Sequence, residues 1–172
     1  NIDIHYPSYW KLASTPNSDK FPEYKESGKV EYNKNRALFA WYAVDPIFGH
    51  PYSNTPKYIK DNLDLMSDHR TRIVHEQEIY PDKTVLANAD SKLAVLNLSY
   101  YPEQRGPYNI SAEEIGRDGK LTNPASRWGG MMRKLENTDF EKANIEYIEF
   151  WLMDPFLTNP DLAFEGGDMY ID

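Results

Sequence analysis

The sequence predicts a mainly β fold, an antiparallel β-sandwich that carries a few short helices. Phe, Trp and Tyr make up 14% of its 172 residues, and 12 prolines are spread along the chain. Aromatic side chains favour strands and prolines interrupt them, so these counts indicate short strands joined by many turns. Several stretches alternate apolar residues at a period of two, and strands do not alternate with long helices as in an α/β protein.

The chain is predicted to consist of an irregular N-terminal segment and one larger domain. Residues 1–30 are rich in turn-forming and polar residues, and Trp10 gives this segment an apolar side chain with which to pack on the body. Residues 31–172 are expected to form the β-sandwich-like domain. Their last letters, GGDMYID, begin a further strand that the sequence does not finish, so we expect this domain to be truncated at its C-terminus.

Three strands are expected before residue 103. Residues 36–44, RALFAWYAV, are apolar on both faces, which is typical of a strand buried between two layers. Trp41 lies in this stretch and is assigned to the core. Residues 71–81 and 91–102 are the other two, and the second of these alternates apolar and polar side chains more regularly.

One helix is expected between the first two of these strands, over residues 53–70. Thr55 suits the position that caps a helix, and Pro56 suits the first position inside it. Apolar residues then recur at helical spacing along one face.

The C-terminal third contains the sequence's strongest strand pattern. Residues 127–135, RWGGMMRKL, predict a strand with a bulge at the glycine pair. The later stretch NIEYIEFWLMDP alternates large apolar side chains on both faces, and we expect it to lie beside residues 127–135 in the core. The side chains of this stretch that are assigned to the core are Ile148, Phe150, Trp151 and Leu152.

Charge and composition exclude several classes of protein. A formal net charge of −8 argues against nucleic acid as a partner, because phosphate contacts require clustered Lys and Arg. No apolar run approaches the roughly 20 residues that a membrane-spanning helix needs. The chain has no cysteine, so disulfides and thiolate metal sites are excluded.

No catalytic constellation is recognisable, and we expect a protein that is not an enzyme and binds neither metal nor cofactor. The four histidines, at positions 5, 50, 69 and 75, lack the spacing of a zinc site. Glu146 and Glu149 fall on opposite faces of the expected strand, so they cannot form the facing pair of a glycosidase. The sequence contains neither a G-x-S-x-G elbow nor a phosphate-binding glycine loop.

Aromatic and arginine side chains in the C-terminal third have two interpretations. Trp128, Tyr147 and Trp151 have the chemistry of a sugar-stacking platform, but they interleave with Ile and Met at strand period, which favours core packing. Trp128 and Tyr147 are the residues assigned to ligand binding if the first interpretation holds. Arg127 and Arg133 are expected to pair with nearby glutamates rather than with a ligand.

Two resemblances add to this reading. The stretch ANIEYIEFWLMDPF followed by GGDMYID resembles neighbouring strands of a jelly-roll of the galactose-binding type, as found in carbohydrate-binding modules. A more specific resemblance runs over residues 33–172 and is carried by six stretches in order. They are NKNRALFAWYAVDPIF, SNTP, YYPEQRGPYN, NPASRWGGMMRKL, TDFEKANIEYIEFWLMDPF and GGDMYID. In these the chain resembles the SprA/Sov family, giant outer-membrane proteins of Bacteroidetes.

The second resemblance implies a function in type 9 protein secretion and gliding motility. It implies a non-enzymatic segment of a β-barrel translocon that caps, gates or scaffolds the pore on one side of the outer membrane. The implied partners are the rest of its own chain, other translocon components and cargo protein. The alternative is a carbohydrate-binding jelly-roll domain at the cell surface, whose partner would be a surface glycan.

Overall fold

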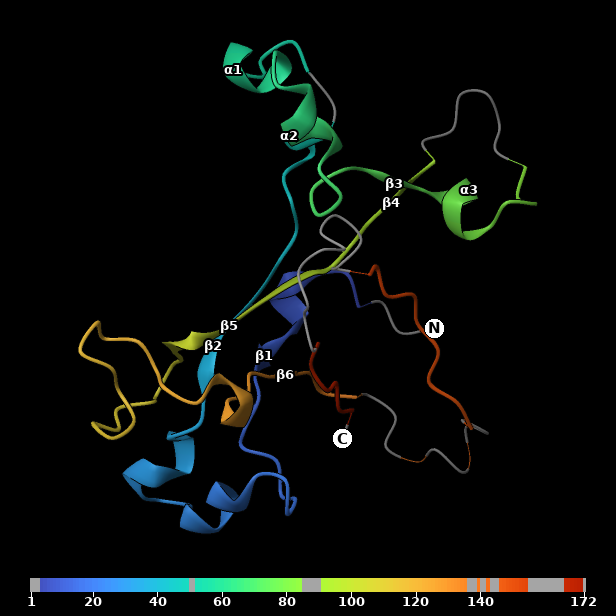
Figure 1. Cartoon of the computed structure of the whole chain (residues 1–172). Helices are drawn as coiled ribbons and strands as arrows, with labels where there is room; N and C mark the ends of the chain where they lie inside the picture. Colours follow the sequence, from blue (N-terminus) through green and yellow to red (C-terminus); the bar gives the residue numbers. More distant parts are fainter. Residues whose placement is uncertain are drawn as a thin grey trace. The chain divides into compact units, whose positions relative to one another are not determined.

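The computed structural model consists of short elements joined by long connections, and its strands pair in small antiparallel sheets (Figure 1). The structure describes residues 4–49, 52–84, 91–135, 139, 142, 146–154 and 166–171. The chain divides into two compact units, one made of residues 1–43 and 96–134 and the other of residues 44–95 and 135–171. Both sides of the boundary expected at residue 30 therefore lie in the first unit.

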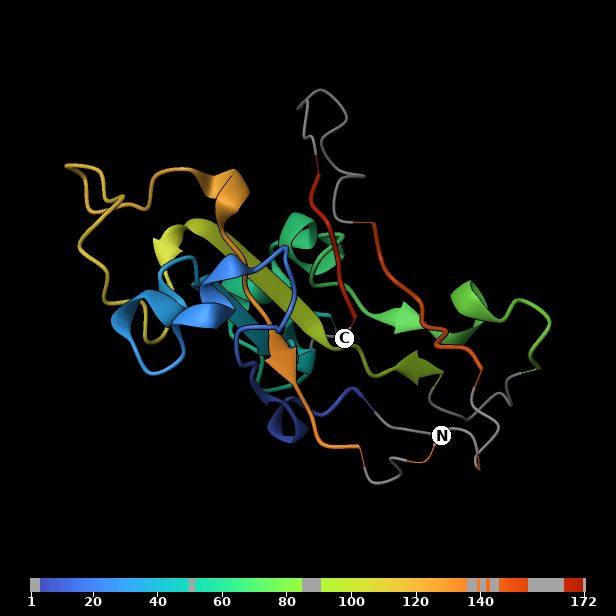
Figure 2. The same ribbon diagram turned by 90° about the horizontal axis from the view of Figure 1, so that it is seen from below.

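The longest strand pair of the first unit is formed by β2 (Ala37–Tyr42) and β5 (Asn97–Arg105) (Figures 1 and 2). The two strands run antiparallel from Leu38 opposite Tyr101 to Tyr42 opposite Asn97. This confirms the strand expected at 36–44, whereas the single strand expected at 91–102 is divided into residues 92–93 and residues 97–105. An isolated two-stranded ribbon is marginally stable in water, so contacts with the rest of the unit must hold it.

A second, shorter pair joins the N-terminal segment to the region before residue 135. Strand β1 (Lys11–Leu12) runs antiparallel to β6 (Met131–Met132), so the strand expected at 127–135 is present over two residues only. A parallel bridge between Arg36 and Trp128 places the approach to β6 beside the start of β2. Gly129 is required there, because an added Cβ would lie 2.6 Å from the Cβ of Phe39.

Short 3-10 helices are the other regular elements described in the first unit. Prolines open three of the four in the first unit, where the missing N–H costs no hydrogen bond. Residues of the N-terminal segment also bond to the body, since Thr15 Oγ1 donates to the carbonyl of Tyr32 and the Tyr32 hydroxyl donates to the carbonyl of Thr15. The 3-10 helices of this unit are η1 (Pro7–Tyr9), η2 (Pro22–Glu26), η3 (Val30–Asn33) and η5 (Pro124–Ser126).

The second unit holds the α-helices of the described residues, and each is four or five residues long. The single helix expected over 53–70 is divided, because Asn62 leaves the helical conformation and its side chain accepts a hydrogen bond from the N–H of Leu65. Ile59 packs the first half into the unit. The elements in chain order are η4 (Pro46–Phe48), α1 (Lys57–Lys60), α2 (Leu63–Ser67), β3 (Val74–His75), α3 (Glu76–Ile79) and β4 (Lys92–Leu93). Strands β3 and β4 pair antiparallel.

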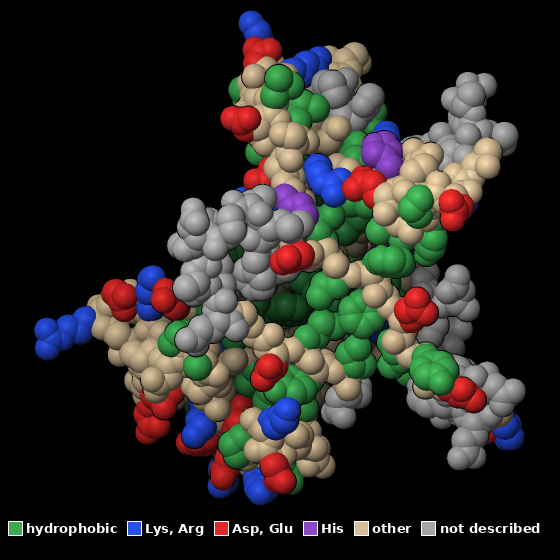
Figure 3. Space-filling model, turned by 45° about the vertical axis from the view of Figure 1, so that its right-hand side comes forward, with side chains coloured by type: hydrophobic (Ala, Val, Ile, Leu, Met, Phe, Trp, Pro, Cys, Tyr) green, Lys and Arg blue, Asp and Glu red, His purple; other side chains and the backbone are tan. Residues whose placement is uncertain are grey.

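The buried hydrophobic core of the described residues is small. It consists of Ala37 and Leu121 in the first unit and Ile59 and Val74 in the second. Most large apolar side chains remain at the surface, where Figure 3 shows hydrophobic groups interspersed with acidic ones. Elements this short bury little apolar surface of their own, and burial of that surface is the main favourable term in folding.

The stretch with the strongest strand pattern lies outside this core, contrary to the expectation from sequence. Residues 146–154 form no strand with any described residue, and the described sheet partner of β6 is β1. An alternating pattern of apolar side chains shows that a segment favours a strand, but a strand forms only where another strand offers an edge to pair with. None of the described residues supplies one here. The exposed fractions are Ile148 72%, Phe150 42%, Trp151 66% and Leu152 67%, whereas Trp41 is partly buried.

Candidate functional site

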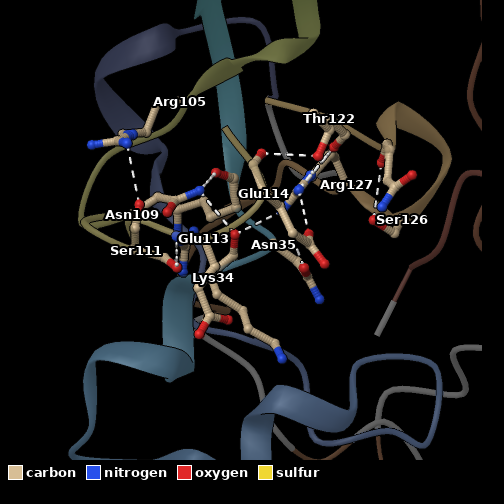
Figure 4. A network of polar contacts seen from close by, with 12 residues as sticks. Lys34, Asn35, Arg105, Asn109, Ser111, Glu113, Glu114, Thr122, Ser126 and Arg127 are labelled. Carbon is tan, nitrogen blue, oxygen red and sulfur yellow. Dashed lines mark hydrogen bonds and ion pairs between the residues drawn. The ribbon is translucent and has the colours of Figure 1, made fainter. Parts of the chain in front are cut away.

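Three connecting segments of the first unit meet around the buried side chain of Arg127 (Figure 4). They are the residues before β2, the turn after β5 and the loop that contains η5. The residues that contact one another there are Lys34, Asn35, Asn109, Glu114, Thr122 and Arg127, which we call the Arg127 cluster. The cluster therefore ties together residues up to 93 positions apart in the sequence.

All five N–H groups of the Arg127 guanidinium are used. Nε and Nη2 donate to the carbonyl of Thr122 at 3.0 and 2.8 Å. Nη1 donates to the carbonyl of Lys34 at 2.9 Å and to the side chain of Asn35, and Nη2 also pairs with the carboxylate of Glu114. This confirms that Arg127 pairs with a glutamate. A guanidinium with every donor engaged has none left for a phosphate or a carboxylate ligand.

Asn109, in the turn after β5, contacts the backbone of the same cluster. Its amide Nδ2 donates to the carbonyls of Lys34 and Arg36, at 3.0 and 2.8 Å. The turn approaches β2 closely because Gly106 donates its N–H to the Arg36 carbonyl. A Cβ on Gly106 would lie 2.2 Å from the carbonyl oxygen of Ala37, so only glycine fits.

Trp128 is enclosed by charged and aromatic side chains beside this cluster. The Arg36 guanidinium lies over its ring at 4.4 Å, and its indole N–H donates to Glu23 Oε1 at 2.8 Å. Phe21 packs edge-on against the ring, with 5.5 Å between the centroids. Burial lowers the pKa of Arg36, opposed by the nearby groups Tyr32, Glu23 and Tyr108, and the guanidinium stays charged.

The buried partners of Trp128 make this arrangement costly to disturb. Glu23 and Arg36 are 3% and 2% exposed, and each has one buried polar atom without a hydrogen-bond partner among the described residues. Buried charges gain stability only through contacts that compensate for their lost hydration. Trp128 supplies a hydrogen bond to one and a ring face to the other, which favours a structural role for this residue.

Tyr100 lies on β5 near the same arginine, and the partial burial of its side chain raises the pKa of its hydroxyl to about 12, with Arg127 acting in the opposite direction. Unfolded tyrosine has a pKa of about 10. Between these pH values the unfolded state binds fewer protons than the folded one, so the free energy of unfolding falls as pH rises.

We therefore expect replacement of Tyr100 by Phe to reduce the alkaline loss of stability. The phenol titrates at higher pH in the folded state, and Phe has no proton to lose. Urea unfolding of both proteins at about pH 9 and about pH 11 measures this difference. An identical loss in the two proteins would show that the Tyr100 hydroxyl is no more buried than in the unfolded chain.

Of the two aromatic residues assigned to sugar binding, only Tyr147 is open to solvent. Its side chain is 84% exposed and lies in the second unit. Trp128 belongs to the first unit, is partly buried, and has one ring face covered by Arg36. Of the two residues, Tyr147 therefore has the ring that is more open to a ligand.

Groups with catalytic or metal-binding chemistry are scattered over the described residues. No cluster of three His, Asp or Glu side chains there has the spacing to hold a metal ion. Ser91 Oγ lies 2.9 Å from Nδ1 of His75, a contact that resembles a nucleophile and its base. Acyl transfer also requires a group that orients the base and donors for the oxyanion, and no such contact to this pair is found among the residues described.

Comparisons with known proteins do not assign the chain to a family. No family model matches the sequence, and a search of curated proteins found no significant match. Within the described residues, no helix has the length and apolar character that crossing a membrane requires.

The residues that sequence analysis missed are those with partners far away in the chain. Glu23 lies 105 positions from the indole that it binds, and Asn109 lies 73 positions from the Arg36 carbonyl. A single sequence carries no signal for such pairs. The available signal was the clustering of Gly, Asn, Arg and Trp in the stretches QRGPYN and NPASRWGG, which now prove to supply close approaches and polar contacts.

Proposed function

We propose that the chain is a non-enzymatic, extracytoplasmic domain of an outer-membrane translocon for type 9 secretion and gliding motility. It acts there as a cap, gate or scaffold of the pore. Its partners are the rest of its own chain, including the barrel, together with other translocon components and cargo protein. The resemblance of residues 33–172 to the SprA/Sov family is the basis of this proposal.

The observation that supports the proposal is that the stretches that resemble the family meet one another in the fold. Residues 33–36, 105–109 and 123–129 come from three of those stretches, and they meet at the Arg127 cluster and at Trp128. The side chains of Asn109 and Arg127 donate to backbone carbonyls of residues 34 and 36, and Arg127 also pairs with Glu114. Such an arrangement fits residues selected for architecture, as in a scaffold, rather than for turnover of a substrate.

The proposal extends to a jelly-roll-like sandwich as the complete architecture. The small antiparallel sheets are compatible with parts of such a fold. Strands β2 and β5 carry apolar side chains on both faces, and Leu98, Tyr100 and Tyr101 are each more than 40% exposed. Additional strands or a neighbouring layer would cover these side chains.

Carbohydrate binding is the second candidate, and the exposed ring of Tyr147 is the observation that favours it. Aromatic rings open to solvent offer a flat apolar face to a sugar. The covered face of Trp128 weakens this candidate, because it removes one of the two rings assigned to the ligand.

The proposal is tested by an in-frame deletion of residues 32–172 from the full-length protein in cells. Barrel assembly is checked separately by heat-modifiable electrophoresis of the outer membrane fraction. We expect secretion of type 9 cargo to be lost while the barrel remains assembled. Full secretion with an intact barrel would overturn the proposal and give weight to carbohydrate binding, which titration against a panel of surface glycans then measures.

A further inference from the structure

Residues 146–153 form an extended segment of the second unit that lacks the sheet partner its sequence favours. Tyr, Ile, Phe and Trp are among the residues with the strongest preference for strands. In the part of the chain that the structure describes, no sheet hydrogen bond joins this segment to another. Just after the segment, the carbonyl of Asp154 lies 2.7 Å from Nε2 of His69, within hydrogen-bonding distance.

Charge and apolar surface are separated along this segment. Its first half carries two exposed carboxylates, on Glu146 and Glu149, and no basic residue. Its second half is apolar on both faces, with the side chains of Phe150, Trp151 and Leu152 exposed. Because successive side chains alternate, Glu146 and Glu149 fall on opposite faces, so a paired strand would meet one carboxylate on each face.

We propose that residues 146–153 add as a strand to the open sheet edge of a partner polypeptide that carries Lys or Arg opposite Glu146 and Glu149. In an antiparallel pairing the basic residues lie in the second half of the partner strand and apolar residues in its first half. Backbone hydrogen bonds supply the affinity, and the side chains supply the register. This inference rests on the proposed function and deepens it by giving the chemistry of one translocon contact.

A second copy of this chain is a poorer occupant of the same segment. If two copies pair antiparallel with Phe150 at the centre, Glu146 lies opposite Asp154 of the other copy. If they pair parallel and in register, Glu146 and Glu149 each lie beside the same residue of the other copy. Like charges directly opposite one another destabilise a strand pair. The net charge of −8 adds a general repulsion between copies.

The test uses two synthetic strands and the whole 172-residue chain. One labelled peptide alternates Val and Thr and carries Lys at the two positions opposite Glu146 and Glu149, and its control carries Glu there. Fluorescence anisotropy measures both dissociation constants at low and high salt. We expect the Lys peptide to bind about tenfold more tightly, since two attractive cross-strand pairs replace two repulsive ones, and added salt to reduce that preference.

Two variants distinguish strand addition from non-specific hydrophobic binding of the peptide. Ile148→Pro removes a backbone N–H, so it should weaken binding of the Lys peptide at least tenfold, whereas Ile148→Val should retain it. The Ile148 backbone makes no hydrogen bond to a described residue that either variant could remove. As a control, both variants should therefore have the melting temperature of the parent chain. Replacing Glu146 and Glu149 by Lys should reverse the preference between the peptides.

Equal affinity for both peptides, no binding, or unchanged binding by Ile148→Pro would each overturn the inference. The assay contains no secretion machinery. Its failure would therefore leave the result of the deletion experiment standing, and loss of the proposed function would leave the peptide result standing.

Discussion

Replacing Arg127 by Ala is expected to destabilise the first unit by about 3 kcal/mol, because a buried side chain that donates five hydrogen bonds to part-buried acceptors is removed. The carbonyls of Lys34 and Thr122 and the side chain of Asn35 all face the missing guanidinium. For a unit of this size, such a loss lowers the melting temperature by about 10 °C or more. Thermal unfolding of the 172-residue chain, followed by near-ultraviolet circular dichroism, measures it.

Arg117→Ala is the matched control for this change. Arg117 lies in the same unit and is exposed, so its removal should shift the melting temperature by about 2 °C or less. Arg127→Lys keeps the charge but offers three donors from a single nitrogen, so it should recover only part of the loss. Equal melting temperatures for the two alanine variants would mean that the Arg127 cluster does not hold the unit together.

The second large effect is expected at Trp128, and Trp151 provides a control of the same residue type. Trp128→Ala should cost about 3–5 kcal/mol, because it leaves a cavity and removes the partner of two buried charges. The charges are those of Arg36 and Glu23. Trp151 is 66% exposed, so Trp151→Ala should change the free energy of unfolding by about 0.5 kcal/mol or less.

Urea unfolding of the two variants decides between the structure and the expectation from sequence. The strand pattern assigned Trp151 to the core, and on that basis its replacement would be the damaging one. A large loss for Trp151→Ala with little loss for Trp128→Ala would restore that assignment. It would also contradict the enclosed position of the Trp128 ring.

Sequence patterns predicted the elements whose stability is decided locally. Strand β2 was expected because its residues are apolar on both faces, and its partner β5 because of its alternation. Gly119, in the stretch RDGK, adopts a positive φ of 80°, a conformation that glycine allows in turns. In each case neighbouring residues in the sequence determine the preference for a strand or a turn.

The same reasoning failed where a partner decides the outcome. Residues 146–153 have a stronger strand pattern than β2, yet they are unpaired among the residues described. The helix expected over 53–70 is broken at Asn62, whose side chain competes for the backbone as asparagine commonly does. Pairing of Arg127 with a glutamate was expected, but the choice of Glu114 depends on a turn in which Glu114 itself has a φ of 57°.

We propose that the Arg127 cluster holds together a domain on which translocation depends. This claim is tested most directly by measuring cargo secretion from cells whose full-length protein carries Arg127→Ala or Arg117→Ala. At equal barrel assembly, we predict that secretion falls severalfold for the first variant and stays at the parental level for the second. Parental secretion by Arg127→Ala, with the isolated chain melting at lower temperature as expected, would contradict the claim.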